Sequence, residues 1–593
     1  MPSKYRSALG VAAAAIIGIA ALATPGGPAA AARRPATAAG DLTRVIVTYD
    51  DPDAAARAVT RTGGTVGRPL SIVAGFAAEV PTQQITALEA APGVRAVALD
   101  GEVDLQGNRW RADGDPNSMY NVVRATGAVD VWRKNDPAGK NILGTGIGVA
   151  LIDSGVAPVK GLNDPARIVN GPDLSFESQA PNLRYVDTFG HGTHMAGLIA
   201  GRDPDVNPLT VNVPGNFTGM APNANLISVK VATADGATDV SQVIAAIDWV
   251  VTHRNDPRLN IRVLNLSFGT DSYQDARLDP LSHAVEAAWK KGITVVVSGG
   301  NDGKTRTALS MPAANPYVIA VGAADSKGTD SRSDDVVADF SSRGNTTRSV
   351  DLTAPGRSIV GLRDPGAYID VNYPTGLVPG DTTGRFFRGS GSSQAAAITS
   401  GAAALLLQQR PGLTPDQVKK LLTSTADAMP AAEVLGRGAG QLNILKAIQA
   451  PTPTTTQTWA ASTGTGSLES SRGTAHVADP TTDTELTGET DIMGRAWNGT
   501  TWAKAASAGT AWSGGTWNGA VWTGTSLTGT TTTGRNWTGV TWSGTNWAGR
   551  TWSGRTWSGA VWDGRTWSGR TWSGTTWSGR TWSGSYWSAS IWK

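Results

Sequence analysis

Residues 121–448 carry short runs of consecutive apolar residues that alternate with longer amphipathic stretches. The runs are IGVALIDSG, NLISVKV, RVLNLSFG, ITVVVSGG and YVIAVGA. Between them lie stretches such as VSQVIAAIDWVVTH and DPLSHAVEAAWKKG, in which apolar residues recur at helical spacing. Strands that are apolar at nearly every position are typical of a sheet that is buried on both faces. The pattern therefore predicts an α/β domain whose parallel sheet is covered by helices on both faces.

Two zones with different patterns precede this domain. Residues 1–32 place Lys4 and Arg6 before an apolar stretch that ends in small residues, which is the order of a secretory signal peptide. Residues 43–105 combine strand-like segments such as TRVIVTY with helix-like segments such as DAAARAVTR, and they predict a small α+β module. The polar residues 106–120 predict an exposed linker, the kind of segment in which proteolytic nicking concentrates. We therefore expect a secreted, extracellular protein.

The pattern changes again after residue 448. Residues 449–490, which include PTPTTTQT, predict a linker, and in residues 491–593 tryptophan recurs mostly in steps of five. An odd period places successive side chains on opposite faces of a straight strand, so a simple hairpin cannot collect these Trp residues on one face. A repeat this regular favours either the turns of a solenoid or a flexible aromatic ribbon.

The composition of this repeat tail indicates what it binds. Trp alternates with Arg and Gly in segments such as TWSGRTWSG. Exposed Trp side chains stack on sugar rings and other polymers, and Arg is available for cation–π contacts. The expected partner is therefore a cell-wall glycan or another polymer, which would associate the protein with the cell wall. The alternative is an anchoring or spacing tail without a specific ligand.

Charge, cysteine content and histidine spacing exclude several functions. The 593-residue chain has a net charge of +3 and its arginines are spread along the tail, so we expect no nucleic-acid partner. The absence of cysteine excludes thiol chemistry and disulfides. His191 and His194 are spaced like ligands on adjacent turns, but Gly192 stands where the H-E-x-x-H zinc motif needs glutamate. We assign no metal ligand and expect no required cofactor.

Four polar residues follow or open predicted elements in this domain. Asp153 and Asn301 each follow a predicted strand, while His191 and Ser393 open predicted helices. In parallel sheets the working residues lie at the carboxyl ends of the strands. A hydroxyl becomes a nucleophile when a base takes its proton and a carboxylate orients that base, and these residue types fit those roles. The amide of Asn301 fits a donor to a tetrahedral oxyanion.

At this point the motifs resemble those of the subtilisin-like serine peptidases. VALIDSGVAP, GHGTHMAGLIAG, GMAPNANLISVKV, VLNLSFG, VVSGGNDG, FSSRG and APG follow the family's order between about 145 and 428. The resemblance implies a subtilisin-like fold and hydrolysis of peptide bonds through an acyl-enzyme. It implies Asp153 as the carboxylate, His191 as the general base, Ser393 as the nucleophile and Asn301 as the oxyanion donor.

The resemblance also implies how substrates and regulation fit the chain. Backbone groups of Ser267, Phe268 and Gly269 would bind an extended substrate, and Ser298, Gly299 and Gly300 would line one wall of its first side-chain pocket. Proteins or peptides would be the substrates. Residues 43–105 would be an inhibitory propeptide, released by a cut in or near residues 106–120. Structural calcium often accompanies the family, but no ligand set is assignable from this sequence.

The serine motif departs from the family pattern. The family typically has Gly-Thr-Ser-Met-Ala followed by Ser or Thr, Pro and His, whereas Ala397 and Ile398 stand here in place of the Pro and His. An alanine keeps the helix that the proline would enter, so the departure concerns the placement of Ser393. Ser392 is the rival hydroxyl. The departure also leaves open a second class of protein, a catalytically degraded peptidase scaffold that binds the cell envelope or a polymer through its Trp tail.

Overall fold

The computed structural model describes residues 42–100, 109–179, 183–204, 213–329, 331–474, 476–477 and 485–522, and short strands between 536 and 587. The predicted signal peptide and residues 106–108 of the predicted linker lie outside this part of the chain. The chain divides into two compact units between Gly107 and Asn108. In the described ranges, no helix has both the length and the apolar character to cross a membrane.

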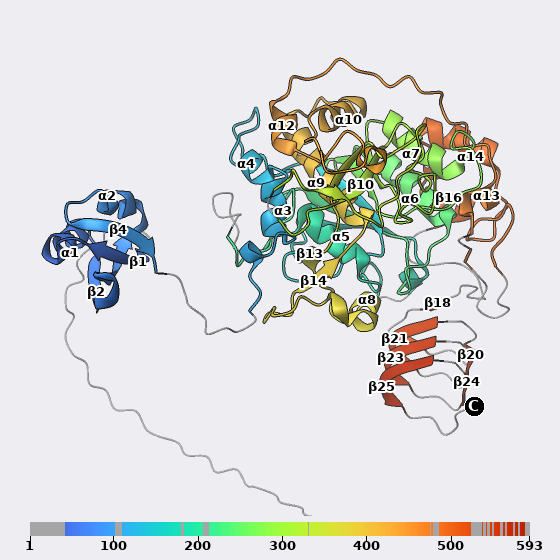
Figure 1. The fold of residues 1–593 in the computed structure, drawn as a ribbon. Coiled ribbons are helices and arrows are strands. Elements are labelled where there is room, and N and C mark those ends of the chain that lie inside the picture. Colours follow the sequence, from blue (N-terminus) through green and yellow to red (C-terminus); the bar gives the residue numbers. More distant parts are fainter. Residues whose placement is uncertain are drawn as a thin grey trace, which may run out of the picture. The chain divides into compact units, whose positions relative to one another are not determined.

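The N-terminal unit is an antiparallel sheet with two helices (Figure 1). Its elements are β1 (Leu42–Tyr49), α1 (Pro52–Arg61), β2 (Thr65–Leu70), β3 (Gly75–Pro81), α2 (Ile85–Glu89) and β4 (Val94–Leu99), with the strand order β2-β3-β1-β4. Helix α1 begins where the Asp51 carboxylate accepts the N–H groups of Asp53 and Ala54, with Pro52 in its first turn. Val45, Val47, Phe76 and Leu88 belong to a core that this unit forms by itself.

The main unit is built on an eight-stranded sheet, and the predicted parallel sheet with helices on both faces is confirmed. The order is β11-β10-β9-β8-β5-β7-β6, with β12 also paired to β10, and only the β10–β11 pair is antiparallel among these described strands. The strands are β5 (Gly148–Asp153), β6 (Ile168–Asp173), β7 (Asn225–Lys230), β8 (Ile261–Leu266), β9 (Thr294–Ser298), β10 (Ile319–Asp325), β11 (Val336–Val337) and β12 (Leu352–Pro355). A separate two-stranded antiparallel sheet pairs β13 (Ile359–Leu362) with β14 (Phe386–Gly389).

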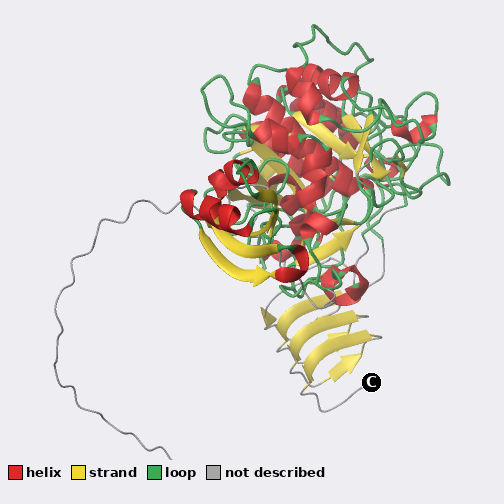
Figure 2. Cartoon of the chain, turned by 60° about the vertical axis from the view of Figure 1, so that its left-hand side comes forward, coloured by secondary structure: helices red, strands yellow, loops and turns green. Residues whose placement is uncertain are grey.

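Helices cover the sheet on both sides (Figures 1 and 2). Helices α6 (Val240–His253) and α7 (Pro280–Lys290) pack on each other and against strands β5 and β9, while α9 (Ser392–Gln409) packs on β8, β9, β10 and α5 (His191–Ala200). The remaining helices of this unit are α3 (Met119–Ala125), α4 (Ala128–Trp132), α8 (Tyr368–Asn372), α10 (Pro415–Ser424), α11 (Val434–Arg437), α12 (Ile444–Gln449), α13 (Leu468–Arg472) and α14 (Gly499–Ala508). Helix α9 is buried from Ser392 to Gln408, which explains its continuous run of small and apolar residues.

The region predicted as a linker and the first part of the tail belong to the core of this unit. Leu468 of the predicted linker packs in the main hydrophobic core, as do five Trp residues of the tail, namely Trp497, Trp502, Trp512, Trp517 and Trp522. The indole N–H groups of Trp502 and Trp517 both donate to Oδ2 of Asp248 on α6, each at 2.8 Å. A buried indole ring contributes a large apolar area but needs a partner for its N–H. The first repeats are therefore docked on the domain.

The later repeats form parallel strands that pair residue i with residue i+15. The main stack is β18 (Asn536–Trp537), β21 (Thr551–Trp557), β23 (Thr566–Trp572) and β25 (Thr581–Trp587), with β19 (Thr541–Trp542) also paired to β21. A second stack pairs β20 (Asn546–Trp547), β22 (Val561–Asp563) and β24 (Thr576–Ser578). The strand pairing thus advances by three five-residue repeats, and its register sets Trp positions opposite Trp positions, as for Trp552 and Trp567.

The buried Asp248 should make the stability of the main unit depend on pH. Burial raises the pKa of Asp248 to about 7, although the two indole N–H groups favour the charged form. Because the unfolded carboxyl titrates near 3.9, only the folded state binds this proton between roughly pH 4 and 7. The free energy of unfolding should fall as the pH rises through that window. Asp248→Asn should remove this fall, because its amide oxygen still accepts the indole N–H groups.

The measurement is urea unfolding at pH 5 and pH 8 in a Ser393→Ala background, which removes the predicted nucleophile. Asp130→Asn is the control, because that carboxylate is exposed and its ion pair with Arg133 is long, at 3.8 Å. An equal pH dependence for Asp248→Asn and the control would contradict the assignment.

Candidate active site

Asp153 and His191 lie in direct contact where β5 ends and α5 begins. Nδ1 of His191 is 2.8 Å from Oδ1 and 3.0 Å from Oδ2 of Asp153. The Asp153 side chain is 5% exposed and that of His191 is 24% exposed, so the carboxylate is enclosed while the ring reaches the surface. Gly192 is needed here because a Cβ at this position would lie 2.1 Å from the Gly155 carbonyl oxygen.

A second layer holds this pair in place. The Ser154 hydroxyl donates to Asp187 at 2.8 Å and accepts the N–H of Gly192 at 2.9 Å, while the Ser154 N–H donates to Asp153 at 2.8 Å. Asp187 also accepts the N–H of Thr193 in the first turn of α5 at 2.7 Å. Before the helix, it accepts the N–H groups of Phe189 and Gly190. Asp187 therefore caps the helix that carries His191. The sequence analysis did not identify this role, because the usual signal is a capping residue directly before the helix, where Gly190 stands.

Asp153 and Asp187 both act on the pKa of His191. Burial opposes a charged ring, but the attraction and hydrogen bond of Asp153, with a further contribution from Asp187, raise the pKa of His191 above its ordinary 6.5. A raised pKa makes the ring a stronger base once it is neutral. His194 behaves oppositely, because burial and the neighbouring His191 lower its pKa to about 3. His194 is thus a neutral packing residue, and a Cβ on Gly361 would lie 2.8 Å from its ring.

Ser393 is the second residue of α9. Its hydroxyl donates to the backbone oxygen of Ser267 at 3.0 Å, and within the described part of the chain no hydrogen bond joins it to His191. Catalytic hydrogen bonds of this kind are often absent or long without substrate. The N–H groups of the first turn of a helix have no partner inside the helix, so the Ser393 N–H is a natural donor to an anion.

Asn301 is oriented by the serine next to the nucleophile. Oδ1 of Asn301 accepts the N–H of Ser392 at 2.8 Å and its hydroxyl at 3.0 Å, and among the described residues the amide N–H groups of Asn301 have no acceptor. Ser392 is fully buried, and its hydroxyl oxygen also accepts the N–H of Gly300 at 3.2 Å. Ser392 is therefore a holding residue for Asn301, a role that the sequence analysis missed when it treated Ser392 as a rival nucleophile.

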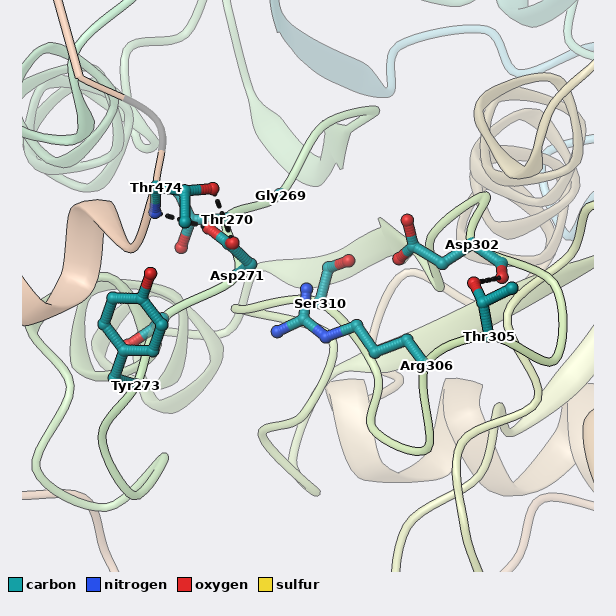
Figure 3. Close-up of a pocket in the computed structure, with 10 residues that line it drawn as sticks. Gly269, Thr270, Asp271, Tyr273, Asp302, Thr305, Arg306, Ser310 and Thr474 are labelled. Atoms are coloured by element: carbon teal, nitrogen blue, oxygen red, sulfur yellow. Dashed lines mark hydrogen bonds between the residues drawn. The ribbon is translucent and has the colours of Figure 1, made fainter.

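The predicted substrate residues lie beside these groups. Ser267 and Gly269 follow β8, with Phe268 half-buried between them, and Ser298 ends β9. Gly299 and Gly300 pack tightly, since a Cβ on either would lie 2.7 Å from a neighbouring atom. A polar pocket of about 640 Å³ opens here (Figure 3). It is lined by Gly269, Thr270, Asp271, Ser272, Tyr273, Asp302, Thr305, Arg306, Ser310 and Thr474, and not by residues 298–300.

Nucleophilic attack by a hydroxyl is the chemistry that this arrangement supports, which places the domain in the class of serine hydrolases. Residues 144–466, more than half of the chain, match the Subtilase family, and the chain belongs to this family. Membership supports a serine peptidase activity.

Named relatives agree with this assignment. The chain is 38% identical over 311 residues to serine protease AprX of Bacillus subtilis (strain 168), covering 51% of this chain and 66% of AprX. It is 30% identical over 298 residues to subtilisin DY of Bacillus licheniformis, covering 50% of this chain and 89% of the relative. The minor extracellular protease Epr of Bacillus subtilis (strain 168) is 30% identical over 279 residues, which are 47% of this chain and 35% of Epr.

The charge on Asp187 should be visible in the pH profile of catalysis. His191 must be neutral to act as a base, so kcat/KM should fall as the pH drops through a His191 pKa above 6.5. Asp187→Asn removes a charge that raises this pKa, and the acidic limb should move to lower pH. The check is the profile of kcat/KM for a small amide substrate, with Asp130→Asn as the control. An acidic limb that stays in place or moves to higher pH would show that Asp187 does not act on His191.

Proposed function

We propose that the chain is a secreted serine endopeptidase that hydrolyses peptide bonds through an acyl-enzyme. The observation that carries the proposal is the 2.8 Å contact between His191 and Asp153, set beside an asparagine whose amide donors are available. Asn301 accepts the N–H of Ser392 at the start of α9, and helix α5, which begins with His191, packs on α9.

The acylation step uses each of these residues once. The Ser393 hydroxyl leaves the Ser267 oxygen, gives its proton to Nε2 of His191, and its oxygen attacks the carbonyl carbon of the substrate. Asp153 stabilises the imidazolium that forms. The oxyanion of the tetrahedral intermediate receives hydrogen bonds from the amide of Asn301 and the N–H of Ser393, and the positive end of α9 favours it further. His191 then protonates the leaving amine as the C–N bond breaks, and an ester with Ser393 remains.

Deacylation repeats these steps with water. His191 takes a proton from a water molecule, whose oxygen attacks the ester carbonyl, and the same two donors bind the second oxyanion. The proton returns to the Ser393 oxygen as the ester bond breaks, and the carboxylic acid product leaves. The enzyme is then restored.

The degraded-scaffold alternative is not favoured. Helix α9 runs unbroken through Ala397 and Ile398, so the missing proline and histidine do not disturb the helix that carries Ser393. Family membership and the paired Asp153 and His191 support catalysis instead.

The N-terminal unit is proposed as an inhibitory propeptide that the enzyme itself removes. It has its own core, as an independently folding propeptide needs. From Trp110 onward the chain is tied to the main unit, because the Trp110 N–H donates to the Gly380 oxygen at 2.9 Å and Asp115 pairs with Arg388 at 2.6 Å. These contacts favour a cut at the beginning of the predicted 106–120 linker, ahead of Trp110.

The proposal extends to the location of the protein and to further partners. A relative is named an extracellular protease, and the predicted signal peptide agrees with secretion. The stacked repeats of the tail are proposed to bind a cell-wall glycan or another polymer. A structural calcium ion stays a proposal without a ligand set.

Self-processing tests the proposal directly. The unmodified chain should lose its residues up to the 106–120 segment, and Ser393→Ala should remain full length, because removing the nucleophile of such a triad lowers kcat by about 10⁶. Intact mass and N-terminal sequencing give the result. Ser392→Ala is the matched control, and it should still be processed, more slowly, since it keeps the nucleophile and loses a contact that holds Asn301. Equal processing of the unmodified and Ser393→Ala chains, or none in either, would contradict the function.

A further inference from the structure

The segment after α13 touches two pockets that share Gly269 and Thr270. Thr474 lines the polar pocket described above. His476 and Val477 line a second, smaller pocket of about 280 Å³, called here the apolar pocket. Its other lining residues are Gly236, Ala237, Thr238, Val240, Val243, Phe268, Gly269, Thr270 and Leu281. The chain after residue 448 is called here the C-terminal extension. We infer that this extension completes the substrate cleft and selects peptides with a polar side chain next to the scissile bond and an apolar side chain further upstream.

The inference rests on the proposed peptidase function and concerns what that peptidase accepts. The pockets adjoin the nucleophile, because Gly269 lies two residues after Ser267, whose oxygen accepts the Ser393 hydroxyl at 3.0 Å. In the described part of the chain, neither the N–H nor the C=O of Gly269 has a hydrogen-bond partner. An extended peptide can pair with such a backbone edge, and its alternate side chains then enter pockets beside it.

The extension is firmly attached where it borders the cleft. Arg472 is fully buried and pairs with the fully buried Asp239 at 2.7 Å, and its guanidinium also donates to the Gly488 oxygen at 2.8 Å. The Thr270 hydroxyl donates to the Ser471 oxygen at 2.6 Å. Gly473 has a φ of +64°, and a Cβ there would lie 2.2 Å from Asp271. The segment is thus fitted against the loop after β8.

In the polar pocket, Thr474 holds the carboxylate of Asp271. Its N–H donates to Oδ1 at 2.8 Å and its hydroxyl to Oδ2 at 2.6 Å, so both carboxylate oxygens are engaged (Figure 3). Burial favours the neutral carboxyl, but these bonds and the charge of Arg306 lower the pKa of Asp271.

Two other charged groups of this pocket are available to a ligand. Among the described residues, the carboxylate of Asp302 and the guanidinium of Arg306 have no hydrogen-bond or ion-pair partner, and Arg306 reaches across the pocket in Figure 3. Burying an apolar side chain against these groups would cost their hydration without replacing it. The pocket therefore suits a side chain that forms hydrogen bonds.

The apolar pocket has the opposite character. Val240, Val243, Phe268 and Leu281 line it from the domain, and Val477 adds an apolar wall from the extension. His476 is held beside Val477 by a 3.0 Å contact with Glu469 on α13. An aliphatic or aromatic substrate side chain gains burial here, in proportion to the apolar area it removes from water.

The test is a position-scanning library of fluorogenic peptide amides, with kcat/KM measured for the processed enzyme. Unmodified enzyme should prefer Gln or Arg over Leu and Phe next to the scissile bond, and apolar residues two to four positions upstream. Thr474→Val frees one oxygen of Asp271 and should raise kcat/KM for Arg relative to Gln by roughly threefold or more. Val477→Ala enlarges the apolar pocket and should favour Phe over Val upstream. Thr474→Ser keeps the hydroxyl and should restore the original ratio.

Matched controls lie on the same extension, away from both pockets. Thr510→Val and the exposed Val521→Ala should leave every ratio unchanged. The rate of labelling of Ser393 by a small fluorophosphonate reports the catalytic groups independently of the pockets. Normal labelling with unchanged ratios in Thr474→Val and Val477→Ala would overturn the inference alone, as would an unmodified enzyme that prefers Leu or Phe at the scissile bond. If the fluorophosphonate does not label Ser393 in the unmodified enzyme, both the proposed function and the inference are overturned.

Discussion

The hydrogen bond between Asp153 and His191 joins the end of a central strand to the start of a helix, and the active site is arranged around that junction. A buried carboxylate is costly unless its oxygens are occupied, and here the His191 ring and the Ser154 N–H occupy them. Asp187 stabilises the same junction, because it accepts hydrogen bonds from the Ser154 hydroxyl and from the Thr193 N–H in the first turn of α5. The base is therefore held by backbone and side-chain contacts before any substrate arrives.

The C-terminal extension is as much a part of the domain as the helices it covers. Two indole N–H groups meet on Asp248, and Arg472 is buried against Asp239. These polar contacts inside an apolar cluster favour one arrangement of the extension, because moving it would separate the buried charges of Asp248 and Arg472 from their partners. A segment anchored in this way can place Thr474 and Val477 reproducibly beside the cleft.

The sheet and the main site residues could be predicted from the sequence because their signals are local. Strand β9 is buried at every residue, which its apolar run indicates, and Asp153, His191 and Ser393 stand at element ends. The docking of Trp502 could not be predicted, because its repeat resembles the later ones and its acceptor lies 254 positions away. The role of Ser392 was missed for the same reason, since its partner Asn301 is 91 positions earlier. Contacts between distant residues leave no periodic pattern.

The central claim is that Ser393, and no other hydroxyl, is the nucleophile activated by His191. The most direct measurement is peptide mapping by mass spectrometry after reaction of the full chain with a fluorophosphonate. The account predicts one adduct, on Ser393, that disappears in His191→Ala, because the neutral imidazole must take the hydroxyl proton. An adduct on Ser392, or labelling of Ser393 that persists without His191, would contradict it.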